Sequence, residues 1–217
     1  MSRLRLFPLP SVLFPGMPLT LNVFEERYRT LVAECVESGE PFGVVLIREG
    51  PEVGGDAVPY STGTTARIVS VQPAGDGRLT LTARGVRRFR ITALHHDRPY
   101  LSADVEYPVD EAADVPEMLL AETRARLQQL QRLRHTIANE YHRQIETPET
   151  PGALADAIGG AAHGLVQPRE LQRLLDTLEV KRRLERAAEV LASLITATHQ
   201  QAAAVVAQRW ASPDRRN

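Results

Sequence analysis

The first half of the chain alternates apolar and polar residues with the period of two that marks half-buried strands. Leu4 and Leu6 alternate with Arg3 and Arg5, and the same pattern recurs after the Asp76-Gly77 turn. The other strand-like stretches are 42–47, which is continuously apolar, and 64–71, 79–82, 88–92 and 101–106. Short strands separated by Pro/Gly turns predict a small barrel or rolled sheet.

One helix is predicted to interrupt these strands. Asn22 is a good N-cap residue, and Glu25 follows three positions later, as in a capping box. An apolar stripe then recurs at helical spacing, formed by Phe24, Tyr28, Leu31 and Cys35. Ser38-Gly39 is expected to end the helix.

The second half becomes helical at about Asp110. A capping pair at Asp114 and Glu117 begins a long apolar stripe through Leu120, Leu127, Leu130, Ile137 and Tyr141, to about Arg143. Thr150-Pro151 and Pro168 each begin a shorter helix, and a last helix runs from about Glu179 to about Trp210. The sequence therefore predicts a β-rich lobe at 1–109 and a helical lobe at 110–217. Their join is short and not rich in Gly or Ser, so we expect the lobes to pack together.

Composition indicates a soluble globular protein. Apolar residues make up 43% and charged residues 24%, and the formal net charge is −1. We find neither a signal-peptide pattern nor the run of about 18 apolar residues that spans a bilayer. Cys35 is the single cysteine, which excludes an intrachain disulfide and fits a reducing compartment. We predict a cytoplasmic protein in which Cys35 is a buried structural thiol.

Several enzyme signatures are missing from the sequence. A phosphate-binding P-loop ends in Gly-Lys-Ser/Thr, but the only lysine, Lys181, follows Val180 and precedes Arg182. The same surroundings argue against a Ser–Lys dyad, which needs a desolvated lysine. His-Glu-x-x-His and Cys-x-x-Cys motifs do not occur, and His95-His96 would point to opposite faces of a strand. We predict no catalytic residue, cofactor or metal, although a triad assembled from distant residues stays open.

Arg84, Arg87, Arg88 and Arg90 form the densest basic cluster. The one interleaved aromatic residue, Phe89, should point inward by strand alternation, whereas stacking on bases needs exposed rings. A net charge of −1 also lacks the basic surplus of proteins that bind phosphate backbones. We interpret the cluster as a solvated strand face with carboxylate partners, and RNA binding is the alternative function.

A resemblance to a known family spans nearly the whole chain. Leu9-Pro-Ser-Val-Leu-Phe-Pro-Gly-Met-Pro-Leu19 and Val23-Phe-Glu-Glu-Arg-Tyr28 resemble the opening of the Lon substrate-binding domain family. Further similar stretches follow in order at 42–47, 63–68, 76–78, 83–91, 154–156 and 171–184. The resemblance implies an α+β fold in which a PUA-like β-barrel lobe precedes a helical bundle. In Lon proteases this domain captures substrate proteins for an attached ATPase and protease, so the resemblance implies a non-catalytic module that binds client or partner proteins.

The loop from Phe14 to Met17 is the predicted contact surface. Two prolines stiffen it, and Phe14 and Met17 would present an adaptable apolar contact. The alternative is that both side chains plug the end of the barrel. Glu26 and Arg27 are candidate rim contacts beside this loop, or members of a solvated helix face. The long helices would also suit a weak homo-oligomer, although the intramolecular bundle needs the same stripes.

Overall fold

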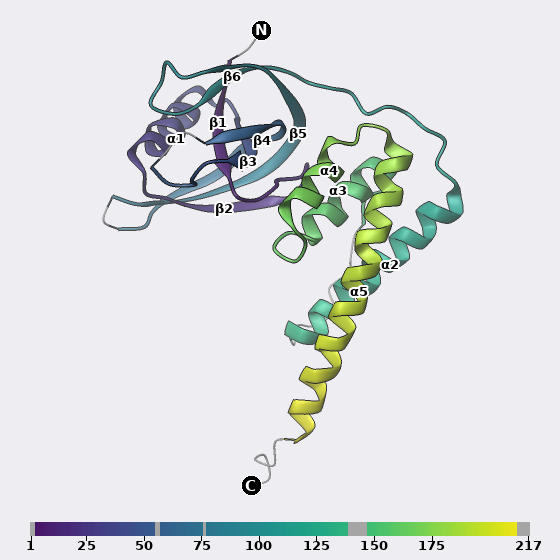
Figure 1. The fold of residues 1–217 in the computed structure, drawn as a ribbon. Coiled ribbons are helices and arrows are strands. Elements are labelled where there is room, and N and C mark those ends of the chain that lie inside the picture. The colour runs from purple at the N-terminus through teal and green to yellow at the C-terminus, as the bar shows by residue number, and fades with distance from the viewer. Residues whose placement is uncertain (1–2, 55–56, 76, 139–146, 212–217) are drawn as a thin grey trace.

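The computed structural model describes residues 3–54, 57–75, 77–138 and 147–211 (Figure 1). The strands and one helix come first. They are β1 (Arg3–Leu9), β2 (Pro18–Val23), α1 (Glu26–Ser38), β3 (Phe42–Glu49), β4 (Val58–Pro73), β5 (Leu79–His95) and β6 (Ser102–Glu106). Four helices follow, α2 (Glu117–Ala138), α3 (Pro151–Ala161), α4 (Pro168–Asp176) and α5 (Val180–Ala211). The predicted α+β class is confirmed, while the closed barrel and the bundle stay predictions.

The six strands form one mixed sheet in the order β2-β5-β4-β3-β1-β6. β1 and β3 pair in parallel, and the remaining pairs are antiparallel. The 17-residue β5 contacts β6 in addition to β2 and β4, so the sheet curls back on itself. Its inner face and α1 enclose an apolar core in which the rings of Phe7 and Tyr28 stack with their centroids 4.0 Å apart.

The start of α1 differs from the prediction. Asn22 lies in β2 opposite Thr80, and the next residue, Val23, is buried in the sheet core. This strand pairing delays the helix, which begins at Glu26 with Glu25 at the N-cap position and no side-chain capping bond. Phe24 consequently precedes the helix and is 55% exposed, so its place in the buried stripe was wrong. The predicted end is confirmed, because Gly39 adopts the left-handed conformation at φ 68°.

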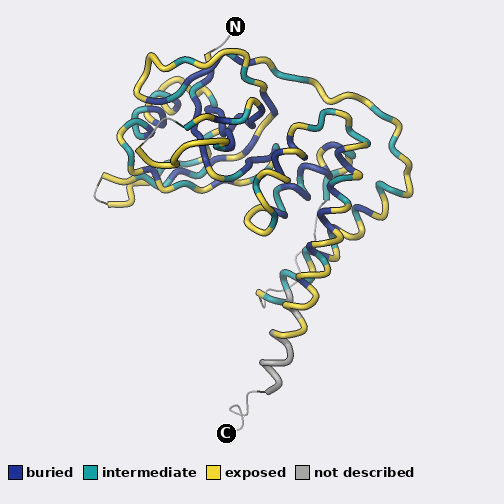
Figure 2. The backbone as a smooth tube through the Cα atoms, in the orientation of Figure 1, coloured by how far each residue is buried: buried dark blue, intermediate teal, exposed yellow. Residues whose placement is uncertain are grey.

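The helical half has its own apolar core. α2 and α5 run side by side, and α3 and α4 lie between them and the sheet (Figure 1). Thr150 caps α3 by accepting a hydrogen bond from the Ala153 N–H, and Pro151 and Pro168 occupy first turns, as predicted. Figure 2 shows buried residues concentrated in the sheet and around α3, whereas the α5 residues beyond Thr198 whose burial is described are exposed. The predicted stripe residue Tyr141 lies outside the described residues.

The segment between β1 and β2 joins the two halves. Val12 and Phe14 belong to the helical core rather than to the sheet core, and Leu46 of β3 joins them there. The Thr64 hydroxyl fixes the segment from the sheet side by donating to the Leu13 carbonyl at 2.6 Å. The lobes therefore pack together, as expected from their short join. The boundary at residue 109 stays a prediction, because this core draws on both sides of it.

Candidate functional site

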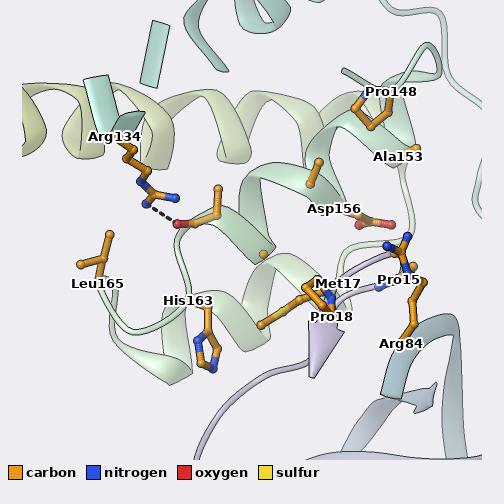
Figure 3. Close-up of a pocket in the computed structure, with 14 residues that line it drawn as sticks. Pro15, Met17, Pro18, Arg84, Arg134, Pro148, Ala153, Asp156, His163 and Leu165 are labelled. Atoms are coloured by element: carbon orange, nitrogen blue, oxygen red, sulfur yellow. Dashed lines mark hydrogen bonds between the residues drawn. The ribbon is translucent and has the colours of Figure 1, made fainter. Parts of the chain in front are cut away.

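A groove of about 860 Å³ lies where the β1–β2 loop meets the helical half (Figure 3). The loop contributes one wall, α3 the floor, and single residues from β5 and α2 the two ends. The lining residues are Pro15, Gly16, Met17, Pro18, Arg84, Arg134, Pro148, Ala153, Asp156, Ala157, Gly160, Ala161, His163 and Leu165. The groove is thus built from four separate parts of the chain.

Small residues of α3 make the floor. Ala153, Ala157, Gly160 and Ala161 are spaced three or four apart and therefore share one helix face. The neighbouring face carries Leu154 and Ile158, which are buried in the helical core. A Cβ atom at Gly160 would lie 3.5 Å from Met17, so the Met17 side chain rests against the helix backbone. The floor consequently presents backbone and methyl groups to any occupant.

The wall is held in shape by backbone hydrogen bonds to β5. The Gly16 N–H donates to the Gly85 carbonyl at 2.9 Å, and the Gly85 N–H donates to the Met17 carbonyl at 2.9 Å. Gly16 has φ +80°, which favours glycine. Gly85 has no room for a side chain, because a Cβ there would overlap the Phe14 carbonyl. Pro15 and Pro18 stiffen the same loop, so the wall is preformed.

The one carboxylate among the described lining residues already has cationic partners. Asp156 of α3 accepts two hydrogen bonds from the Arg88 guanidinium, and the Arg183 guanidinium lies 3.6 Å away. Both arginines are buried, and Arg183 also forms a two-pronged pair with Asp110. Arg88 donates further to the Leu175 carbonyl at 3.0 Å. This buried network ties β5 to α3 and α5 beneath the groove.

The predicted contact residues are divided by the structure. Met17 lines the groove and is partly exposed. Phe14 is completely buried, because its ring inserts against Gly159 in the helical core. The expectation of an exposed Phe14 was therefore wrong. The alternative was that Phe14 and Met17 both plug the end of the barrel, whereas the Phe14 ring packs in the helical core.

Glu26 and Arg27 lie at the far end of β2 from Met17. Glu26 is exposed and accepts a hydrogen bond from Arg29 at 2.8 Å. Arg27 pairs with Glu25 and lies 4.6 Å above the Tyr28 ring. It borders a separate hollow of about 210 Å³ that His96 and Arg98 also line. The structure therefore does not bring these two residues together with the loop.

The basic cluster is also divided. Arg88 is buried in the network described above, which the expectation of a solvated face missed. Arg87 lies over the Tyr107 ring at 3.5 Å, and Arg90 pairs with Glu106 at 3.5 Å, so among the exposed arginines of the cluster only Arg90 has a described carboxylate partner. Phe89 is buried as predicted. RNA binding would have to use the three exposed arginines, and it stays an alternative prediction.

Other predictions concern features outside the groove. Cys35 is buried, as predicted, and burial raises the pKa of its thiol to about 11. His95 contacts Asp104 at 2.9 Å. Within the described ranges, no three His, Cys, Asp or Glu residues are placed to hold a metal ion. None of the described helices is both long and apolar enough to cross a membrane.

Sequence reasoning missed most of the groove. Arg134 of α2 is 50 positions from Arg84 in the chain, and the packing of α2 against α5 and α3 brings it to the groove. One signal was available, namely the run of small residues at helical spacing from Ala153 to Ala161.

Comparison with known proteins gives a consistent result. Residues 3–193 match the model of the ATP-dependent protease La (LON) substrate-binding domain. The chain is 32% identical over 186 residues to a Lon protease of Anaeromyxobacter dehalogenans, which covers 83% of this chain and 22% of that protein. A Lon protease of Roseiflexus castenholzii is 34% identical over 185 residues, covering 83% of this chain and 23% of that protein. The chain therefore spans less than a quarter of the length of these relatives.

Solved structures support the same assignment. A Lon N-terminal domain protein from Xanthomonas campestris is 28% identical and superimposes with a TM-score of 0.62, covering 86% of this chain and 96% of that one. The N-terminal domain of a Lon protease from the Mycobacterium avium complex shares the fold, with a TM-score of 0.65 at 20% identity, covering 88% and 98% of the two chains. The ordered motifs, the α+β architecture and the family match over residues 3–193 together show that this chain belongs to the LON substrate-binding domain family.

Proposed function

We propose that the chain is a protein-binding module that holds apolar segments of client polypeptides in the groove between the β1–β2 loop and α3. The observation that carries the proposal is the preformed apolar wall and floor, which leave Met17 partly exposed above a helix face of small residues. Leu165 adds a side chain that is 63% exposed at the same groove. Exposed apolar surface that lines a groove is typical of binding sites.

Membership of a substrate-binding family supports this role. The family match covers the binding domain, and the proposal assigns no reaction to the chain itself. Met17 suits a site that accepts many sequences, because an unbranched thioether adapts to irregular partners. The rigid loop provides the complementary property, since a preformed wall loses little conformational entropy when a segment binds.

Fluorescence anisotropy with an unfolded protein tests the proposal. The probe is fluorescein-labelled ribonuclease kept unfolded by reduction and carbamidomethylation, and the same protein with its native disulfides is the folded control. We expect the chain to bind only the unfolded form. Met17→Ser should weaken binding about tenfold, because it removes most of a buried thioether contact.

Met118→Ser is the matched control variant. Met118 is 74% exposed in the first turn of α2, at the opposite end of that helix from Arg134, so its replacement should leave binding unchanged. Equal affinity of Met17→Ser and wild type for the unfolded probe would refute the groove as the binding site. Equal affinity for the folded and unfolded probes would refute recognition of exposed apolar segments.

A further inference from the structure

The ionisable groups of the groove are unbalanced in charge. Its described lining includes two arginines and a histidine but only one carboxylate, Asp156. That carboxylate is itself buried and held by Arg88 and Arg183, which are not lining residues. The one negative charge among the described lining residues is therefore already paired with arginines outside the lining.

Arg134 is the more constrained of the two arginines. Its guanidinium donates to the Ala161 carbonyl at 2.6 Å, at the end of α3, and no described carboxylate pairs with it. Burial lowers the pKa of the Arg134 guanidinium, because the charged form has lost hydration. A planar guanidinium held by one carbonyl retains donors for a carboxylate.

Arg84 lies at the other end of the groove. It projects from β5 next to the Pro15–Pro18 wall, is exposed, and has no ion-pair partner among the described residues. Figure 3 shows Arg84 and Arg134 on opposite sides of the groove, with Met17 and Pro18 between them. A bound segment would thus meet positive charge at both ends and an apolar surface in the middle.

We infer that the groove selects extended apolar segments that carry Asp or Glu on both flanks, with Arg84 and Arg134 contacting the two side-chain carboxylates. This preference rests on the proposed function and deepens it. The apolar centre of the segment packs against Met17 and the α3 floor, while the flanking carboxylates supply the missing counter-charge. Charge-assisted hydrogen bonds from arginine to carboxylate are among the stronger polar contacts in proteins.

Three labelled peptides test the preference by anisotropy. Each is acetylated and amidated with the centre Ala-Leu-Phe-Ala-Leu, and the two flanking residues are both Asp, both Asn or both Lys. We expect wild type to bind the Asp peptide about fivefold more tightly than the Asn peptide, and the Lys peptide most weakly. Added salt should reduce the difference between the Asp and Asn peptides, because it screens exposed charges.

Variants then assign the preference to the two arginines. Arg84→Glu should reverse the order of the Asp and Lys peptides, and Arg134→Gln should reduce the preference for Asp. Arg78→Glu is the matched control, because Arg78 is exposed on the β4–β5 hairpin beyond the opposite end of the β2–β5 pairing. Unfolding midpoints of all variants show whether the fold is intact. Arg84→Glu is the decisive variant, because Arg84 is exposed and its replacement should not disturb the fold.

The outcomes separate this inference from the proposed function. Equal binding of all three peptides, with every affinity lowered by Met17→Ser, would overturn the acidic preference and leave groove binding intact. A preference for Asp that survives Arg84→Glu and Arg134→Gln would also overturn it. Tighter binding of the Asn peptide with a free C-terminal carboxylate than of the amidated Asp peptide would overturn it in favour of chain ends. Absence of binding to every peptide and to the unfolded ribonuclease would refute the proposed function itself.

Discussion

Gly159→Ala offers a quantitative test of how the groove is held in place. A Cβ atom at Gly159 would lie 2.5 Å from the Phe14 ring, and that ring is fully buried. Replacing glycine by alanine in a helix stabilises by about 1 kcal/mol, whereas overpacking of a core costs about 3 kcal/mol at the upper end of its usual range. We therefore expect Gly159→Ala to lower the free energy of unfolding by about 2 kcal/mol.

A double-mutant cycle isolates the contact. Phe14→Leu alone should cost about 1.5 kcal/mol through lost packing. In the double variant the shorter side chain relieves the overlap and the helix gain remains, so the total cost should be about 0.5 kcal/mol instead of about 3.5 kcal/mol for independent sites. Gly160→Ala is the matched control, because its Cβ would make ordinary contacts at 3.5 Å with Met17 and should stabilise by about 1 kcal/mol.

Urea unfolding followed by far-ultraviolet circular dichroism measures the free energy of unfolding of wild type and of the four variants. Equal m-values would show that unfolding exposes the same surface area in each protein. Additive costs, or a Gly159→Ala variant as stable as Gly160→Ala, would refute the argument. Either result would mean that the Phe14 ring moves aside, and the loop that carries Met17 would then not be anchored as described.

Three further predictions concern ionisable side chains. Arg88→Met should lower the free energy of unfolding in urea by about 3–5 kcal/mol, because it leaves Asp156 buried without its main partner. Adding Asp156→Leu should recover much of this lost stability, and a double variant as unstable as Arg88→Met would contradict this account. Burial opposes ionisation of Asp110, but the hydrogen bond and charge of Arg183 lower its pKa below the ordinary range. Its stabilising effect is therefore complete above about pH 4 and is lost as pH falls through the lowered pKa, so melting temperatures should fall less steeply in acid for Asp110→Asn than for wild type. With the pKa of Cys35 raised to about 11 by burial, a thiol-reactive dye at pH 8 should label the chain only in denaturant, and rapid native labelling would contradict its burial.

Local patterns in the sequence determined most of the elements. Alternation at Leu4 and Leu6 predicted β1, and capping at Thr150-Pro151 predicted the start of α3, because both signals depend on residues a few positions apart. The helix start predicted from the capping box at Asn22 was wrong, because a distant contact decides the structure there. Asn22 pairs with Thr80 of β5, more than fifty positions away, and that pairing outweighs a local capping preference.

Tertiary structure alone decided the groove. The sequence singled out Phe14 and Met17 together, but their three-residue separation cannot show that one side chain enters the helical core while the other stays at its surface. The same holds for Arg84 and Arg88, of which one faces the groove and the other is buried against Asp156 on α3. Burial and ion pairing depend on which distant surface packs against a residue, and here that surface is α3. Periodicity fixes only which side of its own element a residue occupies. The family and fold class were therefore readable from the chain, and the groove was not.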